Sequence, residues 1–393
     1  MPGAEVPGVP RPRPAILGLM SAHSVPFDGF YSVIPAGGVG SRLWPLSRAD
    51  APKFLHDLTG SGQTLLKDTW DRLAPLSGEQ RIMVVTGRAH RAAVESQLPE
   101  LADVNVVLES EPRDSTAAIG LAAAILELRE PGVVIGSFAA DHVISGDALF
   151  RSAVADAITA AKNGYIATIG ITPTEPAVGF GYIECGQQLA IPGAGRVEVV
   201  ANFVEKPDLE TARDYVDGGA HLWNAGMFIA KASTLLEELA RTKPELHAGL
   251  IELAAAWDDP ATRGPAVDRI WPKLEKIAID YSVAEPAADA GRLVVVRGHF
   301  QWDDVGDFAS LAKLNSSGRS GELAILGEHA RVLADASSGI VISRSKRVIS
   351  LIGVQDIVVV DTPDALLVTT SEHAQRVKAV VDALRLGGSG DVL

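Results

Sequence analysis

The residues best suited to chemistry lie in segment 30–55, FYSVIPAGGVGSRLWPLSRADAPKFL. After a short apolar run come three glycines, which permit positive φ angles and bring backbone N–H groups close to an anion: Gly37, Gly38 and Gly40. Arg42 and Lys53 then add positive charge, the guanidinium as a planar fork for two oxygens and the ammonium as a point charge. Together these residues predict a loop that binds the phosphates of a nucleoside triphosphate.

Two common glycine motifs do not fit this segment. A P-loop requires Gly-Lys-Ser/Thr at the end of its turn, but Gly40 is followed by Ser41 and Arg42. A dinucleotide-binding fingerprint requires a third glycine that opens a helix, and Pro45 disfavours a helix running directly out of the turn. For the loop taken alone, a tight turn with two surface cations stays open as the simpler interpretation.

The segment resembles the signature of the sugar-1-phosphate nucleotidyltransferases, and residues 42–48 (RLWPLSR) followed by PKF at 52–54 are most similar to the mannose-1-phosphate guanylyltransferases. Further matches follow in the family's order, so that the resemblance covers about residues 30–370: Glu111-Pro112 with Thr116-Ala117, Ala140-Asp141-His142, Gly179-Phe180-Gly181-Tyr182, Val204-Glu205-Lys206-Pro207, Trp223-Asn224-Ala225-Gly226-Met227-Phe228, Ile279-Asp280-Tyr281 and Trp302-Asp303-Asp304-Val305-Gly306. The resemblance implies transfer of GMP from GTP to mannose-1-phosphate, giving GDP-mannose and pyrophosphate.

The implied chemistry is an in-line attack of the sugar phosphate on the α-phosphorus, which needs positioning and charge neutralisation more than a protein nucleophile. By resemblance, Asp141 and Asp304 hold Mg²⁺, the expected cofactor, whose octahedral shell would be completed by phosphate oxygens and water. Asp303 competes with Asp304, and register with the family's Trp-x-Asp-Val-Gly favours Asp304. Arg42 and Lys53 complete the expected catalytic set. Taken alone, each aspartate has a loop or helix-cap role as its alternative.

The resemblance also implies how the substrates are bound. The backbone of the three glycines with Arg42 is expected to hold the β- and γ-phosphates, and Lys53 to lie nearer the α-phosphorus. Glu111 is the expected acceptor for the N1–H and amine of guanine, with backbone contacts from about Thr116. The sequence departs here from the family's GRNTAP, because residues 113–118 read RDSTAA. These residues therefore do not fix the base by themselves.

For the sugar phosphate, the resemblance implies a pocket in which an ammonium binds the phosphate while polar groups meet the hydroxyls. Its expected residues are Gly181, Glu205, Lys206 and Asn224. Asp280 also matches the family pattern, with a structural hydrogen bond as its alternative role. These residue types do not distinguish mannose from other hexoses.

The elements that must position these residues alternate between strand and helix. Short apolar runs, typical of buried parallel strands, cover residues 31–35, 81–86, 104–109, 133–138 and 165–169. Helical patterns lie between them at residues 64–76, with a Thr64 cap, 115–129 and 147–162. This alternation predicts a doubly wound, mostly parallel, Rossmann-like α/β sheet whose ligands lie at the carboxyl ends of its strands. The glycine loop and Asp141 are expected at such ends.

After the expected catalytic domain, residues 30–317, the sequence pattern changes to short strands separated by turn residues. The strands are predicted at residues 323–326, 331–334, 339–343, 348–352, 357–360 and 365–369. They predict a small β domain over residues 318–370, which by resemblance is a short left-handed β-helix. A helix is predicted from a Ser371 cap to Leu386, within a C-terminal helix and tail at 371–393. The chain is too short for the isomerase domain of the family's long bifunctional members, so no isomerase activity is expected.

Composition sets broader limits. With 393 residues, of which 47% are hydrophobic, the chain can bury the cores of more than one domain. The net charge of -14, without a visible basic face, argues against nucleic acid as a partner. No apolar run approaches the roughly 18 residues of a membrane span, which favours a cytoplasmic enzyme with no membrane partner. Residues 1–29 carry six prolines and little apolar periodicity, which predicts a disordered leader.

Two other functions stay open. One is a nucleotidyltransferase for another pair of nucleoside triphosphate and hexose-1-phosphate. The other is a catalytically inactive regulatory subunit that senses a nucleotide sugar; a sensor could dispense with the metal and the cations, so the presence of Arg42, Lys53 and Asp304 weighs against it. Self-association into a homo-oligomer, through the β region or the closing helix, is a further expectation from the resemblance.

Overall fold

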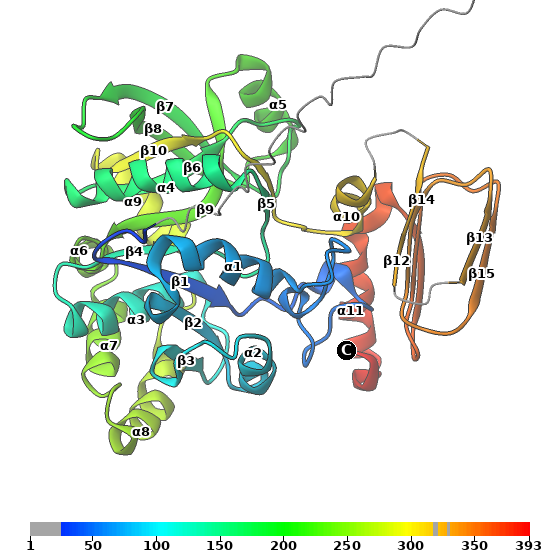
Figure 1. Cartoon of the computed structure of the whole chain (residues 1–393), viewed down its shortest axis with the longest axis horizontal. Helices are drawn as coiled ribbons and strands as arrows, with labels where there is room; N and C mark the ends of the chain where they lie inside the picture. Colours follow the sequence, from blue (N-terminus) through cyan, green and yellow to red (C-terminus); the bar gives the residue numbers. More distant parts are fainter. Residues whose placement is uncertain (1–24, 317–320, 328–330) are drawn as a thin grey trace, which may run out of the picture.

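The computed structural model describes residues 25–316, 321–327 and 331–393, which form a large and a small lobe (Figure 1). Residues 1–24 of the predicted leader lie outside the described residues. Among residues 25–29, predicted to belong to the same disordered leader, Phe27 is partly buried against the large lobe, whereas Val25 is 80% exposed. Phe27 N donates to Leu76 O at 2.7 Å, and the Arg151 guanidinium lies 4.4 Å from the centroid of the Phe27 ring.

The large lobe is built on a nine-stranded sheet with the order β3-β2-β1-β4-β9-β6-β10-β8-β7. Its strands are β1 (Phe30–Ala36), β2 (Ile82–Gly87), β3 (Val106–Glu109), β4 (Val134–Ser137), β6 (Ile166–Ile171), β7 (Gly181–Leu189), β8 (Val197–Glu205), β9 (His221–Lys231) and β10 (Leu293–Gly298). The pairs among β3, β2, β1 and β4 are parallel, as is β6 with β10.

The α/β class is confirmed, with a larger antiparallel share than predicted. Strands β7, β8 and β9 pair antiparallel with their neighbours, so the sheet is mixed. Strands β7, β8, β9 and β10 were not predicted from the sequence. Strands β7 and β8 contain exposed positions, as antiparallel strands with one solvated face do, whereas β9 and β10 are mostly buried runs that were not identified.

Helices cover both faces of this sheet (Figure 1). Neighbouring residues of β1 point to opposite faces: Val33 packs into the core under α3 and Ile34 into the core under α1, and both are fully buried. One face carries α1 (Leu65–Ser77) and α4 (Asp147–Lys162), and the other carries α3 (Asp114–Arg129), α6 (Ala232–Thr242), α7 (Pro244–Ala255) and α9 (Glu285–Asp289). The remaining helices of this lobe are α2 (Arg91–Gln97), α5 (Leu209–Gly218) and α8 (Pro260–Ile270). The predicted cap of α1 is confirmed, since Thr64 accepts from Lys67 N.

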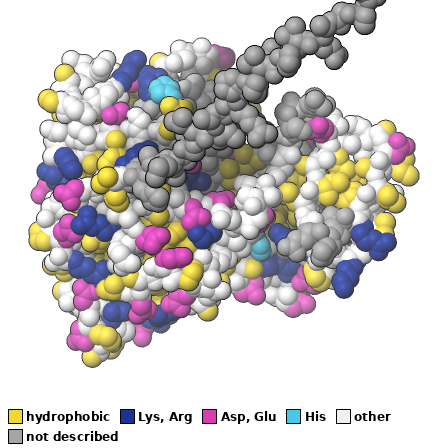
Figure 2. All heavy atoms as spheres, in the orientation of Figure 1, with side chains coloured by type: hydrophobic (Ala, Val, Ile, Leu, Met, Phe, Trp, Pro, Cys, Tyr) yellow, Lys and Arg dark blue, Asp and Glu magenta, His cyan; other side chains and the backbone are white. Residues whose placement is uncertain are grey.

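The small lobe is the predicted β domain. Its strands are β12 (Leu323–Leu326), β13 (Arg331–Asp335), β14 (Gly339–Ser343), β15 (Val348–Ile352), β16 (Ile357–Asp361) and β17 (Leu366–Thr370). From β12 to β16 successive strands alternate between two sheets, with β12, β14 and β16 parallel in one and β13 and β15 parallel in the other, and β17 then pairs antiparallel with β16. This is the winding of a β-helix, while its left-handedness stays a prediction. Figure 2 shows apolar side chains gathered on this lobe, and its exposed ones include Leu333 and Val348.

Helices α10 (Phe308–Asn315) and α11 (Val377–Leu386) lie between the two lobes (Figure 1). The prediction that one helix starts at a Ser371 cap is wrong: Ser371–Arg376 forms 3₁₀ turns without a side-chain cap, and α11 begins at Val377. One hydrophobic core joins Trp44 of the glycine-rich segment to Val305 and to Ile340 of the β domain. No helix among the described residues is long and apolar enough to cross a membrane.

Candidate active site

A short two-stranded ribbon brings the two predicted metal ligands together. Asp141 lies between β4 and β5 (Val143–Ser145), and Asp304 directly follows β11 (Gln301–Asp303). Strands β5 and β11 pair antiparallel, with Asp303 opposite Val143. Both predicted ligands therefore reach one small cavity of about 300 Å³. The cavity is lined by Gly40, Ser41, Arg42, Lys53, Asp141, His142, Asp304 and Gly306.

Lys53 lies at the centre of this small cavity. Its Nζ is 2.6 Å from Asp141 Oδ2 and donates to the backbone carbonyl of Asp304 at 2.6 Å and of Val305 at 3.3 Å. The side chain is only 8% exposed. Gly40 allows this approach, because its φ is 75° and a Cβ there would lie 2.7 Å from Lys53 Cβ. The loop after β1 and the loop after β11 are thus joined by one buried ammonium.

The two carboxylates of the small cavity differ in their electrostatics. Burial would raise the pKa of Asp141, but the adjacent Lys53 ammonium holds it below its usual value. Burial raises the pKa of Asp304 to about 6 despite the opposing charge of Lys53. Asp303 is turned elsewhere, since its Oδ1 accepts from Val305 N at 2.7 Å. Asp304 is therefore mostly ionised at neutral pH, and a bound cation would favour its ionised form further.

His142, which follows Asp141 in the sequence, also lines the small cavity. Its Nδ1 accepts a hydrogen bond from Trp302 Nε1 at 3.2 Å, which assigns the proton of the neutral ring to Nε2. Burial lowers the pKa of His142 to about 4, so the ring is neutral at physiological pH. A neutral imidazole N–H at this position can donate to an anionic ligand without adding charge.

The three glycines of the predicted loop have different neighbours. Gly40 lines the small cavity, whereas a Cβ on Gly38 would meet no atom within 4 Å. A Cβ on Gly37 would lie 3.3 Å from Glu109 Oε2, so the Glu109 carboxylate lies against the loop. Burial raises the pKa of Glu109 to about 7. Glu109 ends β3, and the strand-end rule that drew attention to Asp141 could have identified it.

Two residues that were predicted to contact the nucleotide, Glu111 and Thr116, contact other groups of the protein in this structure. The Glu111 side chain is 48% exposed and pairs with Arg113, while its carbonyl accepts from Trp271 Nε1 at 2.7 Å. Thr116 is fully buried, with its N–H bonded to Ile277 O at 3.3 Å and its hydroxyl to Ser282 Oγ at 2.7 Å. Both residues have protein partners in the free protein, and Glu109 is the carboxylate that lies against the loop. The roles of Glu111 and Thr116 in nucleotide binding stay predictions.

The four predicted sugar-phosphate residues form a second cluster. Lys206 Nζ lies 2.6 Å from Glu205 Oε1, and a Cβ on Gly181 would lie 2.6 Å from Glu205 Oε2. Asn224 Nδ2 donates to Asp280 Oδ1 at 2.9 Å. Burial and the nearby Glu205 raise the pKa of Asp280 to about 6, and, although burial opposes it, the bond to Glu205 raises the pKa of Lys206. One ammonium thus faces two carboxyl groups beside a close-packed glycine.

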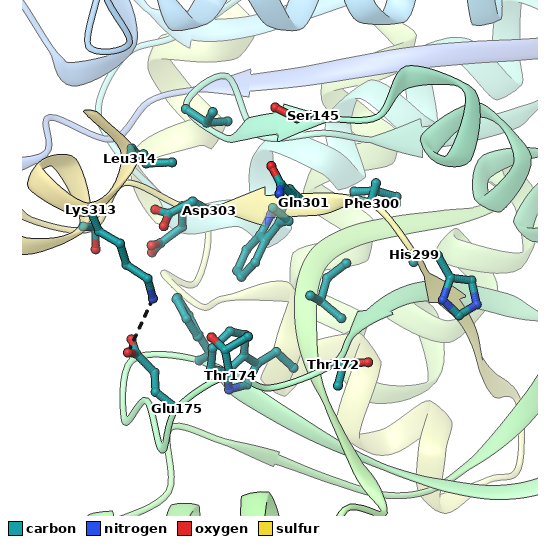
Figure 3. Close-up of a pocket in the computed structure, with 18 of the residues that line it drawn as sticks. Ser145, Thr172, Thr174, Glu175, His299, Phe300, Gln301, Asp303, Lys313 and Leu314 are labelled. Carbon is teal, nitrogen blue, oxygen red and sulfur yellow. Dashed lines mark ion pairs between the residues drawn. The ribbon is translucent and has the colours of Figure 1, made fainter. Parts of the chain in front are cut away.

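A larger cavity, of about 700 Å³, lies beside the small one and shares Asp304 with it (Figure 3). Its aromatic wall consists of Phe180, Trp223 and Trp302, whose rings meet edge to face or tilted at 5.1 to 6.5 Å. Figure 3 shows Lys313 and Glu175 facing each other, 3.6 Å apart. Phe180 and Trp223 adjoin Gly181 and Asn224 of the second cluster in sequence, although none of that cluster's four residues is among those that line this cavity.

The donor set of the small cavity fits Mg²⁺ that is shared with a substrate. In the described ranges, no three His, Cys, Asp or Glu side chains lie together as a metal site. Two carboxylates, Asp141 and Asp304, line the cavity, and both supply hard oxygen donors. Mg²⁺ commonly takes only one or two carboxylates and completes its shell with phosphates and water. The protein's oxygen donors therefore suit a metal that arrives with a triphosphate.

Comparison with known proteins agrees with this geometry. Residues 31–320 match the family described as nucleotidyl transferase, and residues 329–384 match the MannoseP isomerase/GMP-like beta-helix domain. A mannose-1-phosphate guanylyltransferase of Escherichia coli K12 is 36% identical over 91% of this chain and 74% of its own length. Another, from Salmonella typhimurium, is 37% identical over 91% of this chain and 72% of its own length.

A solved structure is also similar to this chain over most of its length. A Thermus thermophilus protein described as a mannose-1-phosphate geranyltransferase has a TM-score of 0.79 and 33% identity, covering 91% of this chain and 99% of its own. Both parts of the fold, the α/β sheet and the β-helix, thus occur in the same order in known proteins. This chain belongs to the nucleotidyl transferase family and, within it, to the mannose-1-phosphate guanylyltransferases.

Proposed function

We propose that this protein transfers GMP from GTP to mannose-1-phosphate and releases pyrophosphate. The observation that carries the proposal is the position of Lys53, whose ammonium touches Asp141 and the backbone of Asp304 inside the small cavity. A buried cation between two carboxyl-bearing loops suits a reaction in which phosphate charge must be neutralised. Relatives with this activity in their names are 36% and 37% identical to the chain over the aligned residues.

In this proposal, Arg42 and the loop after β1 hold the β- and γ-phosphates, and Lys53 neutralises charge at the α-phosphoryl group. Asp141 and Asp304 would hold Mg²⁺, which when bound would neutralise phosphate charge and orient the oxygens. Lys53 keeps Asp141 ionised, and a pKa of about 6 leaves Asp304 mostly ionised at neutral pH, so both carboxylates are ready to meet a cation. The proposed reaction needs no nucleophile from the protein.

Glu109 is the proposed reader of the base. Its carboxylate lies against Gly37 at the carboxyl end of β3, where a nucleoside attached to the loop-bound phosphates would lie. An ionised carboxylate accepts from both the N1–H and the exocyclic amine of guanine, which adenine and uracil cannot offer together. Binding of guanine would then favour the charged form of a group whose pKa is about 7 in the free protein.

The sugar phosphate is proposed to bind from the larger cavity. Lys206 would pair with its phosphate, while Glu205 and Asn224 would meet its hydroxyls. The shared residue Asp304 puts the two substrates next to each other, as an in-line attack requires. Hydroxyl recognition by buried polar groups penalises the wrong epimer, because a mismatch leaves such groups unpaired.

The test is pyrophosphate release by the purified protein with Mg²⁺, across four nucleoside triphosphates and two hexose-1-phosphates, mannose and glucose. The proposal expects the pair GTP and mannose-1-phosphate to dominate and Asp304→Asn to abolish turnover with a preserved melting temperature. Dominance of another pair would keep the mechanism and discard Glu109 as a guanine reader. Binding of GDP-mannose without any release would instead indicate the regulatory subunit.

Besides the site residues and the handedness of the β-helix, four expectations from the sequence remain predictions: the domain boundaries at residues 317 and 370, self-association, Mg²⁺ as the metal, and a cytoplasmic location. Gel filtration tests self-association. Comparison of Mg²⁺ with Ca²⁺ and with chelator tests the metal, because Ca²⁺ prefers more ligands at longer distances.

A further inference from the structure

Gln375 connects the two sides of the small cavity, although it lies far from both in the sequence. Its Oε1 accepts a hydrogen bond from Arg42 Nη1 at 3.0 Å, and its Nε2 donates to Asp307 Oδ2. Arg42 belongs to the loop after β1, and Asp307 follows Asp304 by three residues. One amide therefore spans the distance between a proposed phosphate-binding cation and the segment of a proposed metal ligand.

Asp307 is a fixed anchor for this bridge. Asp307 is 5% exposed. Its Oδ1 accepts hydrogen bonds from the backbone N–H groups of Ala309 and Ser310, and this side chain therefore caps α10. On the other side, Ala374, the neighbour of Gln375, is buried in the core that both lobes share. The side chain of Gln375 is exposed, but its amide is held by Asp307 and its backbone by the buried Ala374, whereas the long Arg42 side chain has many rotamers of its own.

The bridge leaves the Arg42 guanidinium able to bind phosphate. Arginine carries five N–H donors in a planar fork, and Gln375 accepts a hydrogen bond from only one of them, on Nη1. Within the described part of the chain, Arg42 has no second hydrogen bond or ion pair, so the edge formed by Nε and Nη2 can meet two phosphate oxygens. A guanidinium that is already oriented loses less rotamer entropy when the triphosphate binds.

We infer that Gln375 is a positioning residue that aims Arg42 at the triphosphate and so couples the C-terminal segment to nucleotide binding. The inference rests on the proposed function, because it gives Arg42 a phosphate to hold. Gln375 acts through Arg42 and does not touch the reacting atoms. Its effect is therefore expected on the KM for the nucleotide, with kcat changing much less.

The experiment is a double-mutant cycle between Gln375→Met and Arg42→Ala, read as the KM for GTP, kcat and the Kd for GTP with Mg²⁺. Methionine keeps the length of the side chain and removes both bonds. In the wild-type background we expect Gln375→Met to raise KM and Kd about fivefold, the worth of one partly exposed hydrogen bond to a charged group. In the Arg42→Ala background the same change should cost less than about twofold, because its target is gone.

A matched control is Asp364→Ala. Asp364 also joins the small lobe to the same loop, through Arg48 at 2.8 Å, and does not contact Arg42. It should change KM by less than about twofold. A second variant, Gln375→Lys, keeps a donor toward Asp307 but puts an ammonium beside Arg42, so it should raise KM more than Gln375→Met does. Melting temperatures of all variants show whether the fold is kept.

An equal loss from Gln375→Met in both backgrounds would overturn the inference, as would a loss from Asp364→Ala as large as that from Gln375→Met. An unchanged KM and Kd in Gln375→Met or Gln375→Lys would also overturn it. Failure of the proposed function has a different signature, namely wild-type protein that releases no pyrophosphate from GTP and mannose-1-phosphate. The Kd arm of the cycle needs no turnover, so it decides the role of Gln375 in that case too.

Discussion

Replacing Lys53 with methionine removes the buried ammonium and keeps a side chain of similar length. The change leaves the Asp141 carboxylate and the carbonyls of Asp304 and Val305 without the cation that lies 2.6 to 3.3 Å from them. Removal of one preorganised charge from a transition state costs a factor on the order of 10² to 10³ in kcat, or about 3 to 4 kcal/mol. We expect Lys53→Met to lose turnover by that factor at saturating substrates.

The same substitution should change the pH dependence of turnover. The Lys53 ammonium acts to lower the pKa of both Asp141 and Asp304, although burial still raises that of Asp304 to about 6. Without the ammonium both pKa values rise, so the carboxylates bind protons at higher pH and compete with a metal cation. The acid limb of kcat against pH should therefore move to higher pH in Lys53→Met.

Pyrophosphate release from pH 5.5 to 8.5, at saturating GTP, mannose-1-phosphate and Mg²⁺, measures both effects. Lys67→Met is the control, because Lys67 also pairs with an aspartate, Asp71, but on the exposed side of α1. A surface pair of this kind contributes about 0 to 1 kcal/mol, so this variant should retain wild-type turnover. A kcat within about threefold of wild type for Lys53→Met, or an acid limb that does not move, would refute the reasoning.

Three further predictions follow from particular contacts. Burial raises the pKa of Glu109 from 4.5 to about 7, so the folded protein holds a proton that the unfolded chain releases. This contribution to stability is complete below pH 4.5 and is lost as the pH rises through 7, by about 3 kcal/mol at most. Urea unfolding at pH 5 and pH 8 should therefore show this loss in the wild-type protein and not in Glu109→Gln. The same pH dependence in both proteins would contradict the assignment. Glu111→Ala should change kcat/KM for GTP by less than about threefold, because the side chain is turned to Arg113 and solvent, and a tenfold loss would restore Glu111 as a base reader. Gly120→Ala should lower the free energy of unfolding by about 1 to 3 kcal/mol, since a Cβ there would lie 2.6 Å from Leu250 Cδ1 between α3 and α7, and an unchanged thermal midpoint would show that these helices adjust at no cost.

Much of the architecture could be predicted from local patterns in the sequence. The apolar runs of β1, β2 and β4 and the periodicity of α3 and α4 depend on neighbours a few residues apart, and the structure has all of them within about two residues of the expected bounds. The alternation of strands and turns in the small lobe was equally local. Strands β7, β8, β9 and β10 were not predicted. In β7 and β8 exposed positions interrupt the apolar run on which the prediction relied, whereas β9 and β10 are mostly buried.

The choice between Glu109 and Glu111 shows where local information ends. Both residues lie at the end of β3, and both carry the side chain that guanine recognition needs. Only the packed structure distinguishes them, because the contact of Glu109 with the loop at Gly37 crosses from one strand to another, while Arg113 draws Glu111 away. The family motif placed a carboxylate in this region, and the packing between strands favours the one two residues earlier.

The sequence by itself determined the alternating α/β class, the glycine loop with its two cations and the two aspartates, because local periodicity and short motifs specify these features. The tertiary structure alone decided that the β5–β11 ribbon brings Asp141 and Asp304 to one cavity and that Gln375 reaches Arg42. No spacing or periodicity encodes such contacts. They arise when two lobes bury a common core, and that burial fixes side chains that are hundreds of residues apart in the chain.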